Sequence, residues 1–591
     1  MTHASQLPVT VHQALSVYET DAVEIVNQTL QELTPGPEQL EIWFLEGCER
    51  FKEATGKSYT KAAALWHQAA EFGHVESQFN LADCYFEGEG VDQNPTLAVY
   101  WWQKAAERED ADAQNALGEC YWTGVGVKQD PLIARDWWER ASQQNQPEAF
   151  YRLGCWFLSM DVGSEGPDNA LNCWKSAAEL GNPNAQFEYA MALIDGIASE
   201  KDSKTGIEWL SKAVEQGQID ALVQMGKLCS QGDLPRDSGF SAIRLWEQAA
   251  ARGSAEAQLL AGLCYLRGDG SPVNLTLAVS YLSDAAAAGN PEANYVLGLE
   301  YWAGDRFPED HDAAVRCWTD AAGTGHAGAQ YRLGVCYFTG DVCKGDVSQA
   351  IDLWAKAADQ NHQDAQLAIS SAYAMGEGVS QDLEKSFFWC RSSAQLGNKE
   401  AMMKLGVHYF CGLGVKENKS TAVRVWKDAA HAGDLDAMCA LATCYQKGEG
   451  VTQDLVQAFQ IWNEAAQAGH LESKNALASC YVSGSGVKKN EEAAVSLWKD
   501  SAHSGDPEGQ HNLAVCHFFG DGVTKDRFEA AHLWQLAADQ HHPNALHWLG
   551  ICYLYGHGVP RDVDRSRTLL QAAADRGVTA AAELINKTGT G

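Results

Sequence analysis

Apolar and small residues recur along this chain with a period of 36 residues, and each period holds two amphipathic stripes. Apolar residues spaced three and four apart mark one face of a helix. In the copy from residue 73 to residue 108, the first stripe is Leu81, Ala82, Cys84 and Tyr85, and the second is Ala98, Trp102, Ala105 and Ala106. Each period therefore predicts a hairpin of two helices, which we call helix A and helix B.

Tryptophan marks the register of the repeat. One column of fifteen positions, each 36 residues from the next, holds tryptophan in eleven copies and leucine or cysteine in the other four. The column is Trp66, Trp102, Trp138, Trp174, Leu210, Trp246, Leu282, Trp318, Trp354, Cys390, Trp426, Trp462, Trp498, Trp534 and Leu570. We therefore expect one continuous array over residues 37–576, with a helical cap over 1–36 and a partial repeat or cap over 577–591.

Turn and cap residues separate the predicted helices. The turn after helix A follows a G-x-G-V pattern that begins at Gly88, whose column is glycine in thirteen copies. The column of Asn94 holds Asp, Asn or Ser in fourteen copies, from Ser58 onward with Gly166 as the exception, and these residues are typical of the N-cap of helix B. The column of Gly73 is mostly glycine, which suits the left-handed residue after helix B. In five copies a polar residue and a proline follow this column, and that pair marks the start of a helix.

These patterns predict an all-α protein, an α/α superhelical solenoid of fifteen helical-hairpin repeats of 36 residues. The pattern A-x-x-x-L-G-x-C-Y-x-x-G-x-G-V-x-x-D-x-x-x-A-x-x-W-x-x-A-A-x-x-G resembles the Sel1-like repeat, a relative of the tetratricopeptide repeat, over about nine-tenths of the chain. Members of that family are mostly adaptors or scaffolds that hold other proteins. The resemblance therefore implies a non-catalytic role in protein–protein interaction.

Copies 4 to 6 depart from the repeat pattern at their turns. Met160, Val162, Ala198 and Leu234 stand where the other copies carry turn glycines. The 36-residue register continues through these copies, so the helical hairpins are expected to persist with a different turn. The sequence does not decide whether these copies form a hinge.

The chain is strongly acidic, with 78 Asp and Glu against 44 Lys and Arg and a formal net charge of -34. This charge repels phosphates and anionic membranes, so we expect no nucleic-acid partner and favour a basic or apolar protein segment. No apolar run approaches the ~18 residues that cross a bilayer, so no membrane insertion is expected. The first residues lack the basic and apolar regions of a signal peptide. That favours a cytoplasmic location over the alternative of an exported or envelope-associated factor.

One acidic column lies in the first turn of helix A, with Asp or Glu in eleven of fifteen copies. Its members are Glu76, Asp112, Glu148, Asp220, Glu256, Glu292, Asp364, Glu400, Asp436, Glu472 and Glu508. An acid there interacts favourably with the helix dipole, by ~0.3–1 kcal/mol. The column also predicts a line of negative charge along one edge of the array, and the two interpretations are compatible.

The 17 cysteines are interpreted as free thiols in a reducing compartment. Nine share one column: Cys48, Cys84, Cys120, Cys264, Cys336, Cys444, Cys480, Cys516 and Cys552. Equivalent positions in adjacent copies should lie ~10 Å apart, beyond the ~7 Å between Cα atoms that a disulfide allows. Some Sel1-like proteins pair two cysteine columns within each repeat, but this sequence has no matching second column. No C-x-x-C motif occurs, so zinc binding has no support.

Two groups of residues suggest chemistry. The S-x-x-K and K-T-G elements of penicillin-recognising serine enzymes occur at residues 58–61 and 204–206, but the register places Ser58 in the N-cap column and the two elements four copies apart. A serine hydrolase is therefore the less favoured alternative. His541, His542 and His547 gather late in the chain without the spacing of a metal-binding motif. We expect no catalytic residue, metal site or cofactor.

Resemblance to tetratricopeptide arrays implies that the variable face of helix A lines a binding groove. It carries over to the columns of Glu76, Phe79, Asp83, Phe86 and Glu87, and the helical spacing of these columns supports it. The candidate partner-binding residues are Phe79, Phe86, Trp122, Tyr295, Trp302, Tyr331, Phe338, Met403, Phe410, His511, Phe518, Phe519 and Tyr555. Exposed aromatic residues there predict a peptide-binding surface. The alternative is that some of these rings pack against a neighbouring repeat.

Overall fold

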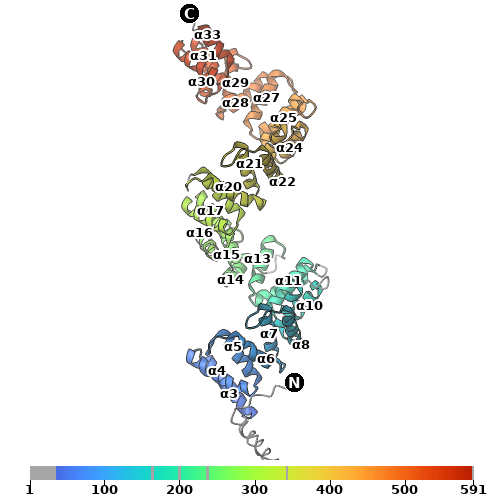
Figure 1. Cartoon of the computed structure of the whole chain (residues 1–591). Coiled ribbons are helices and arrows are strands. Elements are labelled where there is room, and N and C mark those ends of the chain that lie inside the picture. The colour runs from blue at the N-terminus through green and yellow to red at the C-terminus, as the bar shows by residue number, and fades with distance from the viewer. Residues whose placement is uncertain are drawn as a thin grey trace, which may run out of the picture. The chain divides into compact units, whose positions relative to one another are not determined.

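The computed structural model describes residues 35–160, 166–197, 201–234, 239–340, 342 and 344–588 (Figure 1). The chain divides into two compact units, residues 1–288 and 289–591. The division falls at the predicted boundary between the seventh and eighth copies. The predicted N-terminal cap lies outside the described residues, apart from positions 35 and 36.

Seven helical hairpins make up the described residues of the first unit. Odd-numbered labels denote helix A and even-numbered labels helix B. The helices are α3 (Pro37–Lys52), α4 (Gly56–Glu71), α5 (Val75–Glu87), α6 (Pro95–Ala106), α7 (Ala111–Thr123), α8 (Pro131–Gln143), α9 (Pro147–Ser159), α10 (Gly166–Glu179), α11 (Pro183–Asp195), α12 (Ser203–Glu215), α13 (Ile219–Gln231), α14 (Ala242–Ala250), α15 (Ala255–Arg267) and α16 (Leu275–Ala287).

The second unit contains eight hairpins and one further A helix. They are α17 (Pro291–Ala303), α18 (His311–Gly323), α19 (Ala327–Thr339), α20 (Val347–Asp359), α21 (Gln363–Met375), α22 (Leu383–Gln395), α23 (Lys399–Cys411), α24 (Lys419–His431), α25 (Leu435–Lys447), α26 (Leu455–Gln467), α27 (Leu471–Ser483), α28 (Glu491–His503), α29 (Pro507–Phe519), α30 (Arg527–Asp539), α31 (Pro543–Tyr555), α32 (Val563–Asp575) and α33 (Thr579–Thr588). The predicted all-α solenoid of helical hairpins is confirmed.

Predicted cap residues begin and end most helices. The Asn94 side chain accepts a hydrogen bond from the Leu97 backbone N–H at 3.1 Å, as an N-cap does. Pro147 follows the N-cap Gln146 at the first position of α9, and the same arrangement begins α11, α17, α29 and α31. Gly88 ends α5 in the left-handed conformation, with φ 81°. The turn chemistry read from the sequence therefore sets the length of the helices.

The first repeat departs from this scheme. Three residues join α3 and α4, and each of these helices has 16 residues. The prediction that Ser58 is an N-cap is wrong. Thr55 caps α4 instead, because its hydroxyl accepts from the Ser58 N–H at 3.2 Å while the Ser58 hydroxyl accepts from the Thr55 N–H at 2.9 Å. This reciprocal capping box starts the helix earlier than in the other copies.

Helix B tryptophans pack directly on small residues of helix A. A Cβ added to Gly334 would lie 2.5 Å from Nε1 of Trp354, so only glycine leaves room for the indole. The Trp354 Nε1–H donates to the Tyr331 carbonyl oxygen at 3.1 Å. The same combination of a close glycine and a bond to a helix A carbonyl occurs at Gly226–Trp246, Gly298–Trp318 and Gly406–Trp426. These contacts hold the two helices of a hairpin close together.

The residue after helix B has a left-handed backbone even where it is not glycine. Gly73 has φ 89°, and the four non-glycine residues of its column that have a positive φ are Glu109, Asn145, Asn361 and His541, at 61° to 67°. A side chain in this conformation costs roughly 1–2 kcal/mol, and asparagine tolerates it best. Glu109 is therefore a strained position that the repeat imposes.

We expect Gly334→Ala to lower the free energy of unfolding by about 1 kcal/mol. The added methyl displaces the Trp354 indole, which costs about 1–3 kcal/mol, and the gain in helix propensity of about 1 kcal/mol offsets only part of that. Gly323→Ala is the matched control in the same unit, because its Cβ meets nothing within 4 Å. Hydrogen exchange of α19–α21 in both variants measures the effect. Equal protection in the two variants would contradict the packing argument.

Glu109→Gly should stabilise the hairpins on either side by about 0.5–1 kcal/mol, because glycine adopts a positive φ without strain. Glu107→Gly, two residues earlier at φ -62°, is the control and should be neutral or destabilising. Thermal unfolding of the two variants beside the parent chain measures both effects. A drop in stability for Glu109→Gly would show that the side chain makes a contact worth more than the strain.

Candidate functional site

The predicted binding columns lie on the A helices of both units. We define the A-helix face as the positions equivalent to Glu76, Phe79, Asp83, Phe86 and Glu87 on the odd-numbered helices. The candidate residues fall into three of these columns. Phe79, Tyr295, Tyr331, Met403 and His511 share the first; Phe86, Trp122, Trp302, Phe338, Phe410 and Phe518 the second; Phe519 and Tyr555 the third. The columns differ in how much of each ring is open to a partner.

Every aromatic residue of the Phe86 column packs on the helix B tryptophan of its own hairpin. Phe86 lies 5.3 Å from Trp102 between ring centroids, and Phe338 lies 5.2 Å from Trp354. The other four pairs are Trp122–Trp138, Trp302–Trp318, Phe410–Trp426 and Phe518–Trp534, at 5.3–6.0 Å. Aromatic pairs at such distances stabilise a fold beyond the area they bury. This column therefore supports the hairpin whether or not a partner also contacts its open edges.

The Phe79 column reaches the next repeat. Tyr295 packs on His326 at 4.6 Å, Tyr331 on His362 at 5.0 Å, and His511 on His542 at 5.0 Å between ring centroids. His326, His362 and His542 are the N-caps of the following A helices. The predicted alternative, packing against a neighbouring repeat, thus applies to these three rings.

Exposure divides the candidate residues. Phe519 and Tyr555 are 50% and 59% exposed, as expected for a binding surface. The expectation of exposure is wrong for His511 and Phe518, which are 8% and 9% exposed because Trp534 and Trp548 pack around them. The remaining candidates are half-buried. Partner binding by this set of residues stays a prediction.

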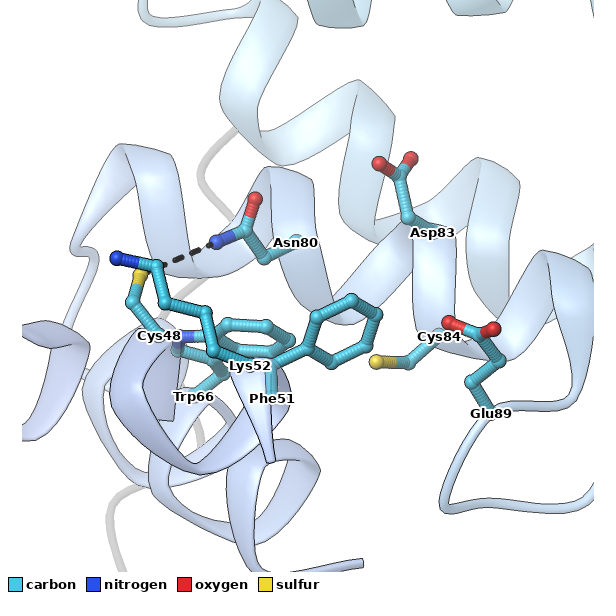
Figure 2. A pocket seen from close by; sticks show the side chains of 8 residues that line it. All are labelled: Cys48, Phe51, Lys52, Trp66, Asn80, Asp83, Cys84 and Glu89. Atoms are coloured by element: carbon cyan, nitrogen blue, oxygen red, sulfur yellow. Dashed lines mark hydrogen bonds between the residues drawn. The ribbon is translucent and has the colours of Figure 1, made fainter. Parts of the chain in front are cut away.

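Two adjoining cavities open between the first A helices of the N-terminal unit, and Figure 2 shows the side chains that line the smaller one. One of about 250 Å³ lies between α3 and α5, and one of about 450 Å³ extends over α5 and α7. Phe51, Asp83 and Glu89 line both. The sequence pattern predicts Asp83, Phe86 and Glu87 on this face, but it does not predict the cavities, because their space depends on how far apart successive A helices lie.

Asp83 is the most perturbed carboxylate in these cavities. Burial raises its pKa to about 6, although a hydrogen bond from the Trp102 Nε1–H at 3.1 Å stabilises the charged form. Glu87, Asp112 and Asp110 raise the pKa further by repulsion. On α7, burial also raises the pKa of Glu119, which Arg152 partly offsets at 3.2 Å. Perturbed carboxylates in a cavity are frequent at functional sites.

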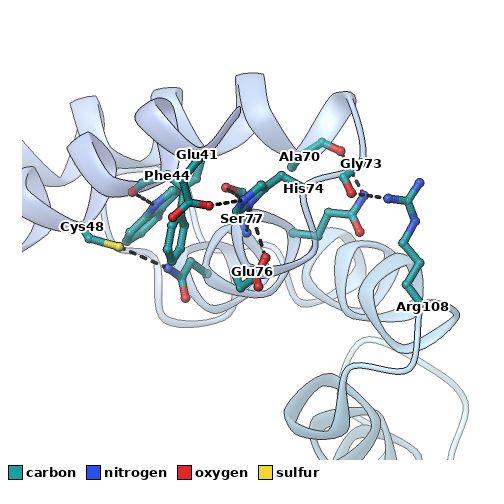
Figure 3. Close-up of polar contacts among 12 residues, drawn as sticks. Glu41, Phe44, Cys48, Ala70, Gly73, His74, Glu76, Ser77 and Arg108 are labelled. Carbon is teal, nitrogen blue, oxygen red and sulfur yellow. Dashed lines mark hydrogen bonds and ion pairs between the residues drawn. The ribbon is translucent and has the colours of Figure 1, made fainter. Parts of the chain in front are cut away.

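Polar contacts join successive A helices along the edge that carries the acidic column, and Figure 3 shows the first, whose acid, Glu41, follows the column position by one residue. His74 caps α5 by accepting from the Ser77 N–H at Nδ1, so its Nε2 donates to the Glu41 carboxylate at 3.3 Å. Six further N-cap side chains contact the acid of the preceding repeat in the same way, at 2.8–3.3 Å: Gln146–Asp112, Asn182–Glu148, His326–Glu292, Asn398–Asp364, His470–Asp436 and His542–Glu508. The acidic column therefore joins successive A helices in addition to lying near the helix dipole.

Ser58, the serine of the S-x-x-K element, forms part of the capping box that begins α4. The Ser58 hydroxyl donates to the Thr55 carbonyl oxygen at 2.8 Å and accepts from the Thr55 N–H at 2.9 Å. Lys204 lies in the first turn of α12, which Asp202 caps through the Thr205 N–H at 3.1 Å. The local geometry thus explains both motifs as helix starts.

The late histidines are also structural. His541 is the left-handed residue before α31, and His542 caps that helix through the Ala545 N–H at 3.2 Å. Burial lowers the pKa of His547. Across the part of the chain that the structure describes, no group of three or more His, Cys, Asp or Glu side chains is arranged to hold a metal ion.

The predicted cysteine column is buried in eight of its nine members, and Cys48 is half-buried. Burial raises the pKa of Cys84 and Cys552 to about 12 and that of Cys120 to about 11. These thiols therefore behave as small apolar residues. The 16 cysteines among the described residues are free, and Cys343 lies outside them.

Comparison with known proteins gives a family. A sequence model of the Sel1 repeat matches fifteen times: residues 53–74, 75–110, 111–146, 147–182, 183–218, 219–254, 255–290, 291–325, 327–362, 363–398, 399–434, 435–470, 471–506, 507–542 and 543–578. None of the curated proteins matches the chain. No helix of the described residues has the length and apolarity to span a bilayer.

Two solved structures are similar to this chain. One is c5321, a protective antigen present in uropathogenic Escherichia coli strains displaying an SLR fold, at 23% identity and a TM-score of 0.50 over 88% of this chain and 97% of that chain. The other is a Sel1 repeat protein from Oxalobacter formigenes, at 28% identity and a TM-score of 0.43 over 55% of this chain and 93% of that chain. The likeness to c5321 supports the fold.

The stability of the last repeats should fall as pH drops from about 6.5 to about 4. Burial lowers the pKa of His511 to about 4 from 6.5, and its Nδ1 accepts from the Trp534 Nε1–H at 3.1 Å. The unfolded chain therefore binds the proton first, and roughly 3 kcal/mol is lost across this window. Hydrogen exchange of α29–α31, corrected for intrinsic rates, measures the loss.

His511→Tyr is the control for this dependence, because Tyr295 and Tyr331 occupy the equivalent positions. The variant should flatten the loss between about pH 6.5 and about pH 4.5. The remaining fall at lower pH should come from Glu508, whose pKa a hydrogen bond from His542 lowers. An unchanged profile in the variant would refute the assignment to His511.

Proposed function

The chain belongs to the Sel1 repeat family, and we propose that it is a non-catalytic scaffold or adaptor that binds a segment of a partner protein along its A-helix face. A Sel1 or tetratricopeptide-like solenoid is typical of protein–protein interaction scaffolds. The observation that carries the proposal is the cavities between successive A helices, which combine aromatic walls with carboxylates. Concave sites with apolar walls and a few polar groups are where ligands usually bind.

The partner segment is proposed to be basic and apolar. The cavity over α5 and α7 is lined by Asp83, Glu87, Glu89 and Glu119 beside Phe86 and Trp102. Its one basic lining residue, Arg152, already pairs with Glu119 at 3.2 Å and with Glu148 at 3.0 Å. A net charge of -34 draws basic segments towards the chain and speeds encounter more than it strengthens the final complex.

The proposal includes a cytoplasmic, reducing setting and no cofactor. The buried cysteine column suits such a compartment, because its thiols are inert while they remain reduced and shielded from solvent. The absence of chemistry is supported by the use of Ser58 in the capping box rather than beside a base. The serine hydrolase alternative has no comparable geometric support.

Cross-linking tests which face is used. Alanine variants of Trp302 and Phe338 would confuse binding with folding, because both rings pack on core tryptophans. A photoreactive phenylalanine analogue at Phe519 or Tyr555 avoids this problem, since both side chains are at least half exposed. Phe528, 77% exposed at the start of α30, is the matched control on a B helix.

In cells that naturally produce the protein, the analogue at Phe519 and at Tyr555 should cross-link the same partner. The yield from Phe528 should be several-fold lower, because contacts concentrate on one face of a repeat array. Mass spectrometry of the cross-linked species identifies the partner peptide. Equal or stronger cross-linking from Phe528 would place the interface on the B helices and reject the proposal.

A further inference from the structure

The cavities between α3, α5 and α7 are acidic. Asp83, which lines both of them, is surrounded mainly by other carboxylates. Among the charged groups that act most strongly on the Asp83 carboxylate, all are other carboxylates, with Glu87 foremost. Lys52 lines the first cavity, but in the view of Figure 2 its ammonium lies beside Cys48 and Asn80 rather than beside Asp83. No cation is therefore among the groups that act most strongly on Asp83.

An equivalent cavity in the C-terminal unit has different charges. It measures about 280 Å³ and lies between α23 and α25, with Trp426 in the place that Trp66 has in the first cavity and Phe410 in the place of Arg50. There, Thr443 replaces Asp83 and Lys447 replaces Glu87. Glu449, which replaces Glu89, is already paired with Lys419 at 2.9 Å. A cavity at this place thus occurs in both units, whereas an acid at the position of Asp83 occurs only in two N-terminal copies, as Asp83 and Glu119.

The walls of the acidic cavities suit a long cationic side chain. Phe51, Phe86 and Trp102 line them, and lysine and arginine bury their methylene groups along apolar surface while the charged end finds a polar partner. Aromatic faces also attract the cation itself, by about 0.5–2 kcal/mol. Asp83 is held in place by the Trp102 indole N–H, so its carboxylate is oriented before a ligand arrives.

We propose that the joined cavities over α3, α5 and α7 bind a lysine or arginine side chain of the partner segment. Its stem lies against Phe51 and Phe86, and its cation pairs with the Asp83 carboxylate. This inference rests on the proposed function and locates its basic anchor in the N-terminal unit. It adds a charged anchor to the sequence-based expectation, in which aromatic residues such as Phe86, Tyr295 and Trp302 bind the partner.

Binding to this site depends on pH. The free Asp83 carboxyl, with a pKa of about 6, must lose its proton before it pairs with a cation. Affinity therefore falls by about tenfold between pH 7.5 and pH 5, since roughly a tenth of such a group is ionised one unit below its pKa. The other charged groups around the cavities are Lys52, Glu87, Glu89, Asp110, Asp112, Glu119 and Arg152.

The test uses a phage-displayed library of random peptides, selected on the full-length chain. Enriched peptides are synthesised, and their affinity is measured by fluorescence anisotropy at about pH 7.5 and about pH 5. They should carry a lysine or arginine next to an apolar residue. Replacing the basic residue of the peptide by norleucine, which keeps an apolar stem and removes the charge, should weaken binding about tenfold or more. Exchanging lysine for arginine in the peptide shows which of the two cations the site prefers.

Two protein variants complete the test. Asp83→Asn keeps an acceptor for the Trp102 indole and should weaken binding about tenfold at neutral pH while removing the pH dependence. Glu449→Gln removes the carboxylate that corresponds to Glu89 from the equivalent cavity of the second unit, and it should leave affinity unchanged. Circular dichroism confirms that both variants fold, and if Asp83→Asn does not, Glu87→Gln at the exposed rim should still weaken binding measurably.

Several outcomes overturn the inference. They are enrichment of peptides without a basic residue, failure to enrich any peptide, and equal affinity for the parent chain and the folded Asp83→Asn variant. The cross-linking at Phe519 and Tyr555 does not depend on a basic residue in the partner. Success there with failure here would leave the A-helix face as the interface and remove only the cation site.

Discussion

The contact between a helix B tryptophan and a small residue of helix A underlies the rest of this structure. At Gly334 the indole of Trp354 rests where a Cβ would stand, and its N–H reaches a carbonyl of the same A helix. Where the small residue is alanine, the indole N–H can turn to a side chain instead, to Asp83 from Trp102 and to His511 from Trp534. The methyl group that distinguishes alanine from glycine at this position therefore goes with a different acceptor for the indole N–H, a side chain of the A-helix face in place of a backbone carbonyl.

Most of the predicted binding face is used for packing. The aromatic column of Phe86 lies on the core tryptophans, and the column of Phe79 reaches the N-cap residues of the next repeat. The acidic column is bound by those same N-caps, as with Glu508 and His542. A repeat array has only one neighbour on each side for every copy, so its stability depends on such contacts between adjacent copies. What stays open to a partner is the space between successive A helices and the residues at its rim.

Sequence periodicity predicted the helices, their caps and the buried cysteines, because each depends on residues a few positions apart. It failed at Ser58, where a shorter loop and the Thr55 capping box shift the helix start without changing the 36-residue count. It also failed for the exposure of His511 and Phe518, because burial depends on Trp534 and Trp548, which lie on other helices of the array. The cavities around Asp83 could not be predicted from the sequence either. Alignment of the repeats shows which residues are equivalent, but not how far apart their helices lie.

Cavities at equivalent places in different copies of the repeat differ in their charged residues. A feature present in many copies, such as the aromatic wall at Phe86 and Phe410, is explained by the needs of the hairpin. A feature confined to a few copies needs another explanation, because the same fold forms elsewhere in the chain without it. Burial and repulsion by neighbouring carboxylates raise the pKa of Asp83. Thr443 occupies the same position of its repeat and carries no charge. Retaining an unbalanced carboxylate at one cavity opposes stability, and a cation supplied by a partner is the compensation that its geometry admits.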